Sequence, residues 1–121
     1  MVMERRTSGT VEANGIRMAY AEAGAGDDVV LLVHGFTGAK EDFSDHLDPL
    51  ADRGWRVIAP DLRGHGETSR PAGTDRYSFE LMQADVEAFV DALGLPRLVL
   101  LGHSMGGVVA QHMARSDPAR L

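Results

Sequence analysis

The segment Gly-His-Ser-Met-Gly at residues 102–106 constrains the fold of this chain more than any other feature. It follows the apolar run at 98–101, which is typical of a buried strand, and it precedes residues 107–115, which are compatible with a helix. A G-x-S-x-G pattern between a strand and a helix predicts a sharp turn that exposes the serine hydroxyl. We expect strained backbone geometry at Ser104, and collisions across the turn if positions 102 and 106 carried side chains.

A second motif, His-Gly-Phe-Thr-Gly at residues 34–38, follows the apolar run at 29–33. The negatively charged oxygen that develops during acyl transfer needs two backbone N–H donors. One can come from the residue after the serine, Met105, and the other from the loop after the earlier strand, most simply Phe36. The glycines of the segment would let this loop pass close to Ser104. Together the two motifs predict a nucleophilic serine beside an oxyanion hole.

A third motif spans residues 57–66, where a strand ends in proline and a glycine-rich turn follows. His65 lies in this turn between two glycines, which mark a position limited by the backbone. We therefore expect His65 to shape the turn rather than to act as a catalytic base. His34, Gly35 and His103 are expected to form the wall of the site. His34 would brace the loop after its strand, and His103 would hydrogen-bond within the wall.

In this order, the three motifs resemble those of the α/β-hydrolase superfamily, and the resemblance runs from about Val11 to Leu121. It implies a serine hydrolase of the esterase branch, with a Ser-acid-His triad in which Ser104 is the nucleophile. It also implies that Phe36 and Met105 supply the oxyanion N–H groups. The epoxide hydrolases and haloalkane dehalogenases of the superfamily use aspartate at the elbow, so the serine argues against those branches.

The chain departs from the superfamily pattern after Ser104. The family order is serine, then acid, then histidine, with the last two placed after later strands. Here the only acid after the serine is Asp117 and the only histidine is His112, and both lie on the helix after the elbow or at its end. The later strands are absent from residues 1–121. We therefore interpret the chain as the N-terminal part of a single α/β-hydrolase domain, which needs a missing C-terminal segment for its acid and base.

The predicted fold class is α/β, with a mostly parallel sheet and flanking helices, because strands alternate with helices along the chain. Asn14-Gly15 between two loosely alternating segments predicts a β-hairpin. Ser78 is expected to cap a helix that ends at Gly94. Pro49 fits best near a helix start, with Asp48 as the cap. The expected segments are hairpin strands at 10–13 and 16–22, buried strands at 29–33, 56–59 and 98–101, and helices near 43–50, between Ser78 and Gly94, and at 105–115.

Composition limits the classes of partner. The net charge of −6 does not favour nucleic acid or an anionic membrane. The chain has no cysteine, which excludes disulfides and thiolate metal sites, and no two histidines have a spacing typical of zinc. We expect neither a metal nor a cofactor. The N-terminus lacks the apolar region of a signal peptide and no run approaches a membrane span, so a cytoplasmic protein is expected.

The favoured function is hydrolysis of a small-molecule ester or related acyl compound. The alternative is a lyase that resembles the enzymes making SHCHC in menaquinone synthesis, on the basis of the 34–38 motif and Arg76-Tyr77-Ser78. Those enzymes usually have tyrosine before the nucleophile and arginine four residues after it, where this chain has His103 and Val108. The third hypothesis is that the chain is a non-catalytic fragment or an interaction module.

The missing strands also predict an exposed edge. In the superfamily the strand at 98–101 lies in the middle of the sheet, so without its later neighbours it becomes an edge strand with unpaired N–H and C=O groups. We expect the isolated chain to bind a complementary C-terminal segment, or to self-associate through residues 98–101. We also expect it to have little activity on its own.

Overall fold

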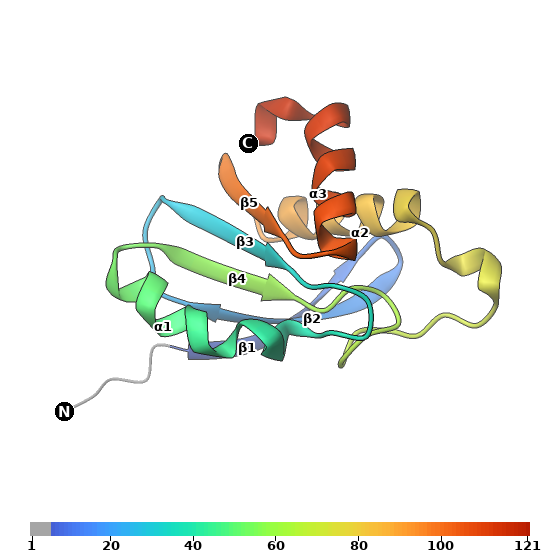
Figure 1. Cartoon of the computed structure of the whole chain (residues 1–121), viewed down its shortest axis with the longest axis horizontal. Coiled ribbons are helices and arrows are strands. Elements are labelled where there is room, and N and C mark those ends of the chain that lie inside the picture. The colour runs from blue at the N-terminus through green and yellow to red at the C-terminus, as the bar shows by residue number, and fades with distance from the viewer. Residues whose placement is uncertain (1–5) are drawn as a thin grey trace.

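A five-stranded sheet organises residues 6–121, the part of the chain that the computed structural model describes (Figure 1). The strands are β1 (Arg6–Ala13), β2 (Ile16–Ala23), β3 (Val29–Val33), β4 (Arg56–Pro60) and β5 (Leu98–Gly102). Their order across the sheet is β1-β2-β4-β3-β5. β3 runs parallel to β4 and β5, whereas β2 is antiparallel to β1 and β4, so only β2 opposes the common direction. The predicted α/β fold with a mostly parallel sheet is confirmed.

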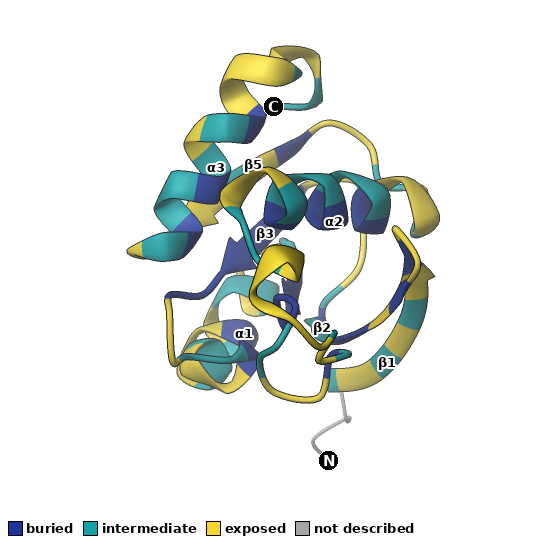
Figure 2. Cartoon of the chain, turned by 90° about the vertical axis from the view of Figure 1, so that its right-hand side faces the viewer, coloured by how far each residue is buried: buried dark blue, intermediate teal, exposed yellow. Residues whose placement is uncertain are grey.

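Helices cover both faces of the sheet (Figure 1). The α-helices are α1 (Ser44–Asp52), α2 (Phe79–Ala92) and α3 (Met105–Ser116), and short 3-10 turns occur at Lys40–Phe43, Thr74–Arg76 and Pro118–Arg120. α1 lies on one face, and α2 and α3 lie together on the other (Figure 2). None of the helices in the described part of the chain is both long enough and apolar enough to cross a lipid bilayer.

β3 contributes side chains to both hydrophobic cores. All five of its residues are buried, and successive side chains point to opposite faces of the sheet. On the α2–α3 side, Leu31 belongs to the same core as Phe89 of α2. On the α1 side, Leu32 belongs to the same core as Leu47 of α1. A continuous apolar run with both faces covered is typical of a central parallel strand. β3 is therefore held rigidly, and the loop after it starts from a fixed point.

Turn and cap residues form the local structures that their chemistry predicts. Asn14 and Gly15 have φ angles of 52° and 77°, and they join β1 to β2 in the expected hairpin. Ser78 caps α2, because its Oγ accepts a hydrogen bond of 3.1 Å from the Leu81 N–H. Gly94, at φ 63°, follows the end of that helix.

The expectation for Pro49 is wrong. α1 begins at Ser44, so Pro49 lies inside the helix rather than near its start. Asp48 does not cap the helix but forms an ion pair of 3.1 Å with Arg6 of β1. Proline in a helix removes the hydrogen bond to the carbonyl four residues earlier. That carbonyl belongs to Asp45, and both Pro49 and Asp45 are exposed, so water can replace the missing donor.

β5 is an edge strand of the described sheet, as expected. It pairs with β3 on one side, and no other described strand lies on its second side. Val99 and Leu101 of this strand are 52% and 48% exposed, although both are apolar. The elbow with Ser104 therefore leaves the sheet from a strand that has one open side.

Candidate active site

Ser104 occupies the tight turn between β5 and α3, at φ 55° and ψ −116°. A residue with a side chain is strained by roughly 1–3 kcal/mol in such a sparsely populated region, and such strain is found mainly at functional sites. The serine is exposed. Its carbonyl accepts hydrogen bonds from the N–H groups of Gly107 and Val108, at 2.8 and 3.2 Å, which fixes the turn to the start of α3. The expected strained geometry at Ser104 is confirmed.

Three glycines allow the backbone segments around Ser104 to approach one another. A Cβ at Gly102 would overlap the backbone of Gly106, which is the collision across the turn that the motif predicts. A Cβ at Gly106 would instead overlap the carbonyl at Val33, so this glycine is needed for contact with the end of β3. A Cβ at Gly35 would lie 3.1 Å from the Ser104 Cβ. The loop after β3 therefore lies directly against the elbow.

Two backbone N–H groups face no protein acceptor near this turn. Within residues 6–121, the N–H groups of Phe36 and Met105 donate to no protein acceptor. The Met105 N–H is the first of α3, where helix geometry leaves donors without partners and the helix dipole favours negative charge. The loop that carries Phe36 is shaped by Thr37 at φ 63° and by a hydrogen bond of 3.0 Å from the Gly38 N–H to the Gly35 carbonyl. Both N–H groups are therefore without a protein acceptor in this part of the chain, and their role in an oxyanion hole stays a prediction.

His34 is fully buried at the end of β3. Its Nε2 lies 3.0 Å from the Leu62 N–H, which can only donate, so Nε2 accepts and Nδ1 carries the proton. Nδ1 then donates to the Gly35 carbonyl at 2.7 Å. Burial lowers the pKa of His34 below its ordinary value of 6.5. The neutral ring joins the loop after β3 to the loop after β4, as expected for a bracing residue.

We expect the free energy of unfolding to fall as the pH drops through about 6.5, since that is where His34 takes up a proton in the unfolded chain. The folded chain resists protonation there, because its His34 pKa is lowered. A His34→Gln variant should lose this part of the pH dependence, worth at most about 1.4 kcal/mol per pH unit. Urea unfolding at pH 7.5 and 5.5 measures it, with His46→Gln, at an exposed position, as the control. Identical pH dependence in His34→Gln and the unmodified protein would show that His34 does not contribute.

The turn that carries His65 is held by two buried ion pairs. Lys40 Nζ contacts Asp61 at 2.8 Å, and Arg63 Nε contacts Asp85 at 2.6 Å. Burial alone would disfavour a charged Lys40, but its hydrogen bonds to carboxylates, first of all to Asp61, raise its pKa well above the ordinary value. The sequence analysis missed both pairs. The available signal was that Lys40 is the only lysine of the chain.

His65 itself has the structural role that its flanking glycines predict. Its Nδ1 donates to the Arg63 carbonyl at 2.9 Å. The centroid of its ring lies 5.0 Å from the ring centroid of His34. Gly64 and Gly66 have φ angles of 76° and 51°, and side chains there would collide with neighbouring groups. His65 is thus a fixed part of the turn.

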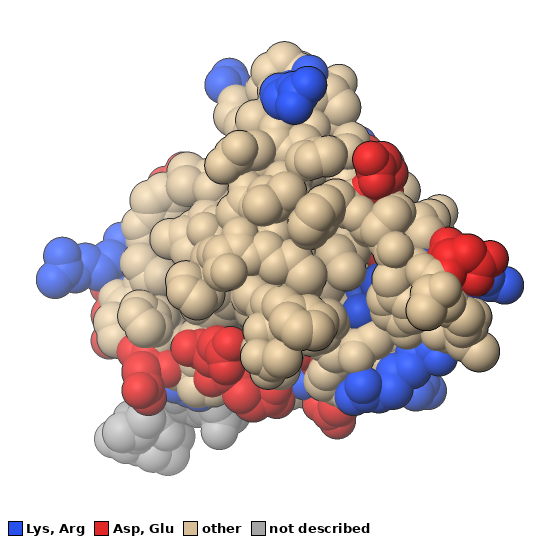
Figure 3. All heavy atoms as spheres, turned by 45° about the vertical axis from the view of Figure 1, so that its right-hand side comes forward, with Lys and Arg blue, Asp and Glu red and all other residues tan. Residues whose placement is uncertain are grey.

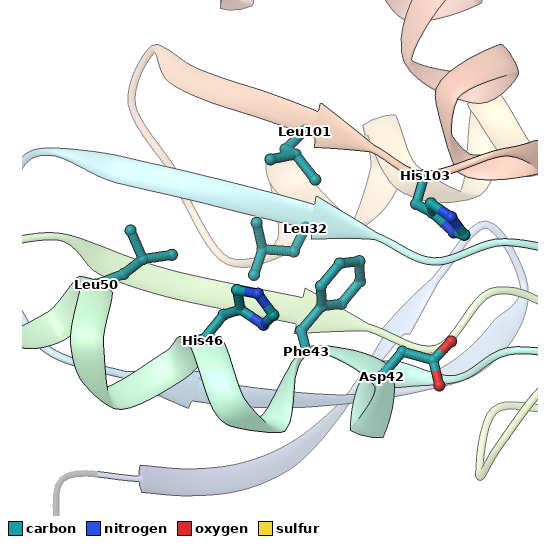
Figure 4. Close-up of a pocket in the computed structure, with 7 residues that line it drawn as sticks. All are labelled: Leu32, Asp42, Phe43, His46, Leu50, Leu101 and His103. Carbon is teal, nitrogen blue, oxygen red and sulfur yellow. The ribbon is translucent and has the colours of Figure 1, made fainter.

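A cavity of about 510 Å³ lies beside His103, on the α1 side of the sheet (Figure 4). Leu32, Phe43, Leu50 and Leu101 give it apolar walls, and Asp42, His46 and His103 add titratable groups. His46 is exposed, as expected for a surface residue. Sequence reasoning missed that Asp42 and His46 share this cavity with His103. Their spacing of four residues, which places side chains on one side of a helical segment, was the signal available.

The described residues supply no general base for Ser104. None of the five histidines, at positions 34, 46, 65, 103 and 112, shares a hydrogen bond with the Ser104 Oγ within residues 6–121. His112 lies two turns along α3, and the centroid of its ring is 6.0 Å from the ring centroid of Phe79. The same part of the chain contains no group of three or more His, Cys, Asp or Glu side chains that could hold a metal ion. The described residues therefore present an exposed serine beside two N–H groups that have no protein acceptor, but not a triad.

A parallel sheet whose strand leads through a strained serine turn into a helix is the arrangement that defines α/β hydrolases. A family model described as the alpha/beta hydrolase fold matches residues 28–121, and the chain belongs to this family.

Several curated relatives are similar to nearly the whole chain. The dihydrolipoyllysine-residue acetyltransferase component of the acetoin cleaving system of Cupriavidus necator is 42% identical over 111 residues, which is 91% of this chain and 29% of that protein. Epoxide hydrolase A of Mycobacterium tuberculosis is 39% identical over 104 residues, or 85% of this chain and 32% of that protein. The chain therefore spans about a third of the length of these relatives.

Solved structures also match nearly the whole of this chain and less than half of their own length. The crystal structure of epoxide hydrolase VrEH1 from Vigna radiata matches with a TM-score of 0.93 and 36% identity, covering 100% of this chain and 39% of that chain. Epoxide hydrolase A from Mycobacterium thermoresistibile matches with a TM-score of 0.90 and 33% identity, covering 96% of this chain and 37% of that one. The N-terminal portion of an α/β hydrolase is thus the part of the fold that residues 6–121 form.

Proposed function

We propose that the whole protein is a serine hydrolase that cleaves ester or related acyl bonds. The single observation that supports this most strongly is the strained, exposed Ser104 beside the unpaired N–H groups of Phe36 and Met105. In the proposed reaction the Ser104 Oγ bonds to the carbonyl carbon and its proton passes to a base. The two N–H groups stabilise the oxyanion, the alcohol leaves with a proton, and water then cleaves the acyl-enzyme.

The choice between an ester and an epoxide depends on the atom that attacks. Several relatives are named epoxide hydrolases, and that branch of the superfamily uses an aspartate at the elbow. A carboxylate that opens an epoxide forms an ester, which water can cleave at its carbonyl. A serine hydroxyl would form an ether, which has no carbonyl for water to attack. Ser104 therefore favours acyl chemistry, and the 42% identical relative is by its name an acetyltransferase component.

In this proposal, the acid and base of the triad do not belong to residues 6–121. We propose that a further segment supplies them and adds a strand to the open side of β5, in line with the greater length of the relatives. An isolated chain that lacks this segment would instead self-associate at β5. The proposed substrate is a small-molecule ester or acyl compound, and the proposed location is the cytoplasm.

The test compares two substrates with the whole protein. We expect p-nitrophenyl butyrate to be hydrolysed at least about 100-fold faster than the buffer reaction, and styrene oxide to give no diol above background. Release of p-nitrophenol and chromatography of the diol measure the two reactions. Diol formation without ester hydrolysis would assign the protein to the epoxide hydrolases and contradict the proposal. Absence of both reactions would favour a non-catalytic role.

A further inference from the structure

A second cavity, of about 420 Å³, lies on the α2 side of the elbow. Met105, which follows the serine, lines this cavity, whereas His103, which precedes the serine, lines the cavity beside α1. Phe36 forms part of the same wall as Met105. Both residues whose N–H groups are the candidate oxyanion donors therefore border the α2-side cavity. A group attached to a carbonyl held by those donors would lie at its entrance.

The wall of this cavity is apolar and largely aromatic. Tyr77, which precedes the cap of α2, and Phe79 and Met82, in the first turn of that helix, complete it with His65. Among residues 6–121, no Lys, Arg, Asp or Glu side chain lines it. Aromatic rings and methionine sulfur make favourable contacts with a further ring, in edge-on or offset arrangements. The composition of the wall thus suits an uncharged, bulky group.

Three polar side-chain atoms of the wall already have partners, whereas the backbone N–H groups of Phe36 and Met105 have none within residues 6–121. The Tyr77 hydroxyl donates to the Pro71 carbonyl at 2.9 Å, and the Ser78 Oγ accepts from the Leu81 N–H at 3.1 Å. The Nδ1 of His65 donates to the Arg63 carbonyl at 2.9 Å. A charged group entering the cavity would lose water and find no opposite charge, which is costly. The cavity should therefore discriminate against charged substituents.

One face of the molecule has an uncharged centre. Figure 3 shows the side of the molecule towards which the strands of the parallel sheet run, with a broad area free of Lys, Arg, Asp and Glu at its centre. Acidic side chains gather at the lower left of this area and basic ones at the lower right. Phe36 and Phe79 are 72% and 41% exposed, which is unusual for large apolar side chains. Contact with a ligand would account for this exposure, and so would contact with the further segment proposed above.

We propose that this cavity is the subsite for the acyl group of the substrate, and that it takes an uncharged aryl or branched-alkyl acyl group. The proposal rests on the proposed function, because it assumes that Ser104 attacks the attached carbonyl. It goes further in naming the chemical class of the acyl group and the residues that select it. Phe79 is the position at which the selection is most directly tested, since its exposed side chain can be replaced without opening the core.

The experiment measures kcat/KM of the whole protein for three p-nitrophenyl esters: the acetate, the phenylacetate and the hemiglutarate, whose acyl group ends in a carboxylate. We expect the phenylacetate to exceed the hemiglutarate by at least about tenfold. Phe79→Lys should reduce this ratio by about tenfold or more, because an ammonium group at the wall attracts the carboxylate. Glu80→Lys is the control for long-range electrostatics. It raises the net charge by two units, against one for Phe79→Lys, on the neighbouring residue at the same helix start but outside the cavity, and it should leave the ratio unchanged.

The outcomes separate the two proposals. If the acetate is hydrolysed but the unmodified protein prefers the hemiglutarate or shows no preference, the subsite assignment is wrong and the proposed function stands. The assignment is also wrong if Phe79→Lys and Glu80→Lys change the ratio equally, because the effect would then be long-range. If none of the three esters is hydrolysed, both proposals fail. The unmodified protein alone gives the first comparison, so the test does not depend on the folding of a variant.

Discussion

Replacing Ser104 by alanine should abolish the labelling of the whole protein by a fluorophosphonate probe. In the labelling reaction the Ser104 Oγ bonds to phosphorus, fluoride leaves, and the hydroxyl proton passes to the base. An ordinary surface serine reacts far more slowly, because it has neither a base nor N–H donors to stabilise the charge on the phosphoryl oxygen. We expect the labelling rate to fall by about 1,000-fold or more.

Intact-protein mass spectrometry over time measures this rate. Ser8→Ala, which removes an exposed serine from β1, is the matched control and should label at the rate of the unmodified protein. Labelling of the Ser104→Ala variant at the original rate would remove Ser104 from the role of nucleophile.

Residues 1–121 prepared alone should hydrolyse p-nitrophenyl esters at a rate close to that of buffer. The strained serine and the two N–H donors are present, but within residues 6–121 no histidine shares a hydrogen bond with the Ser104 Oγ. Loss of triad members leaves only the small acceleration due to the oxyanion hole and binding. We expect kcat/KM to be about 1,000-fold or more below that of the whole protein.

Hydrogen exchange at the amides of β3 provides the control for this comparison, because those buried amides are protected only if the isolated chain folds. Turnover at a normal esterase level would instead show that one of His34, His65, His103 and His112 can serve as the base. The His→Gln variant that abolishes the turnover would then identify it.

The parts of the fold that the sequence predicted depend on short segments. The run at 29–33 is apolar on both faces, the Asn14-Gly15 pair selects a hairpin turn, and Ser78 caps the helix after it. Each of these is decided by residues close to one another in the chain. Pro49 was misplaced because the penalty for proline in a helix depends on whether water can reach the freed carbonyl, and that is a property of the folded surface.

Some features of the candidate site also follow from short segments of sequence, whereas others depend on residues far apart in the chain. Ser104, its strained backbone and the close approach at Gly102 follow from the local G-x-S-x-G pattern. The contact of Gly106 with β3 joins residues about seventy positions apart in the sequence. The hydrogen bond between Arg63 and Asp85 joins residues twenty-two positions apart. No pattern within one segment encodes such pairs. The α2-side cavity could not be predicted for this reason, because its wall combines four separate segments.

The backbone at Ser104 has a consequence for the evolution and the engineering of this protein. Glycine adopts a φ of 55° without strain, so a glycine at this position would relieve roughly 1–3 kcal/mol and remove the hydroxyl at the same time. Thermostability and reactivity therefore compete at a single residue. Selection for folding alone would favour replacement of Ser104, and a stability screen without an activity assay would enrich variants that lack its hydroxyl.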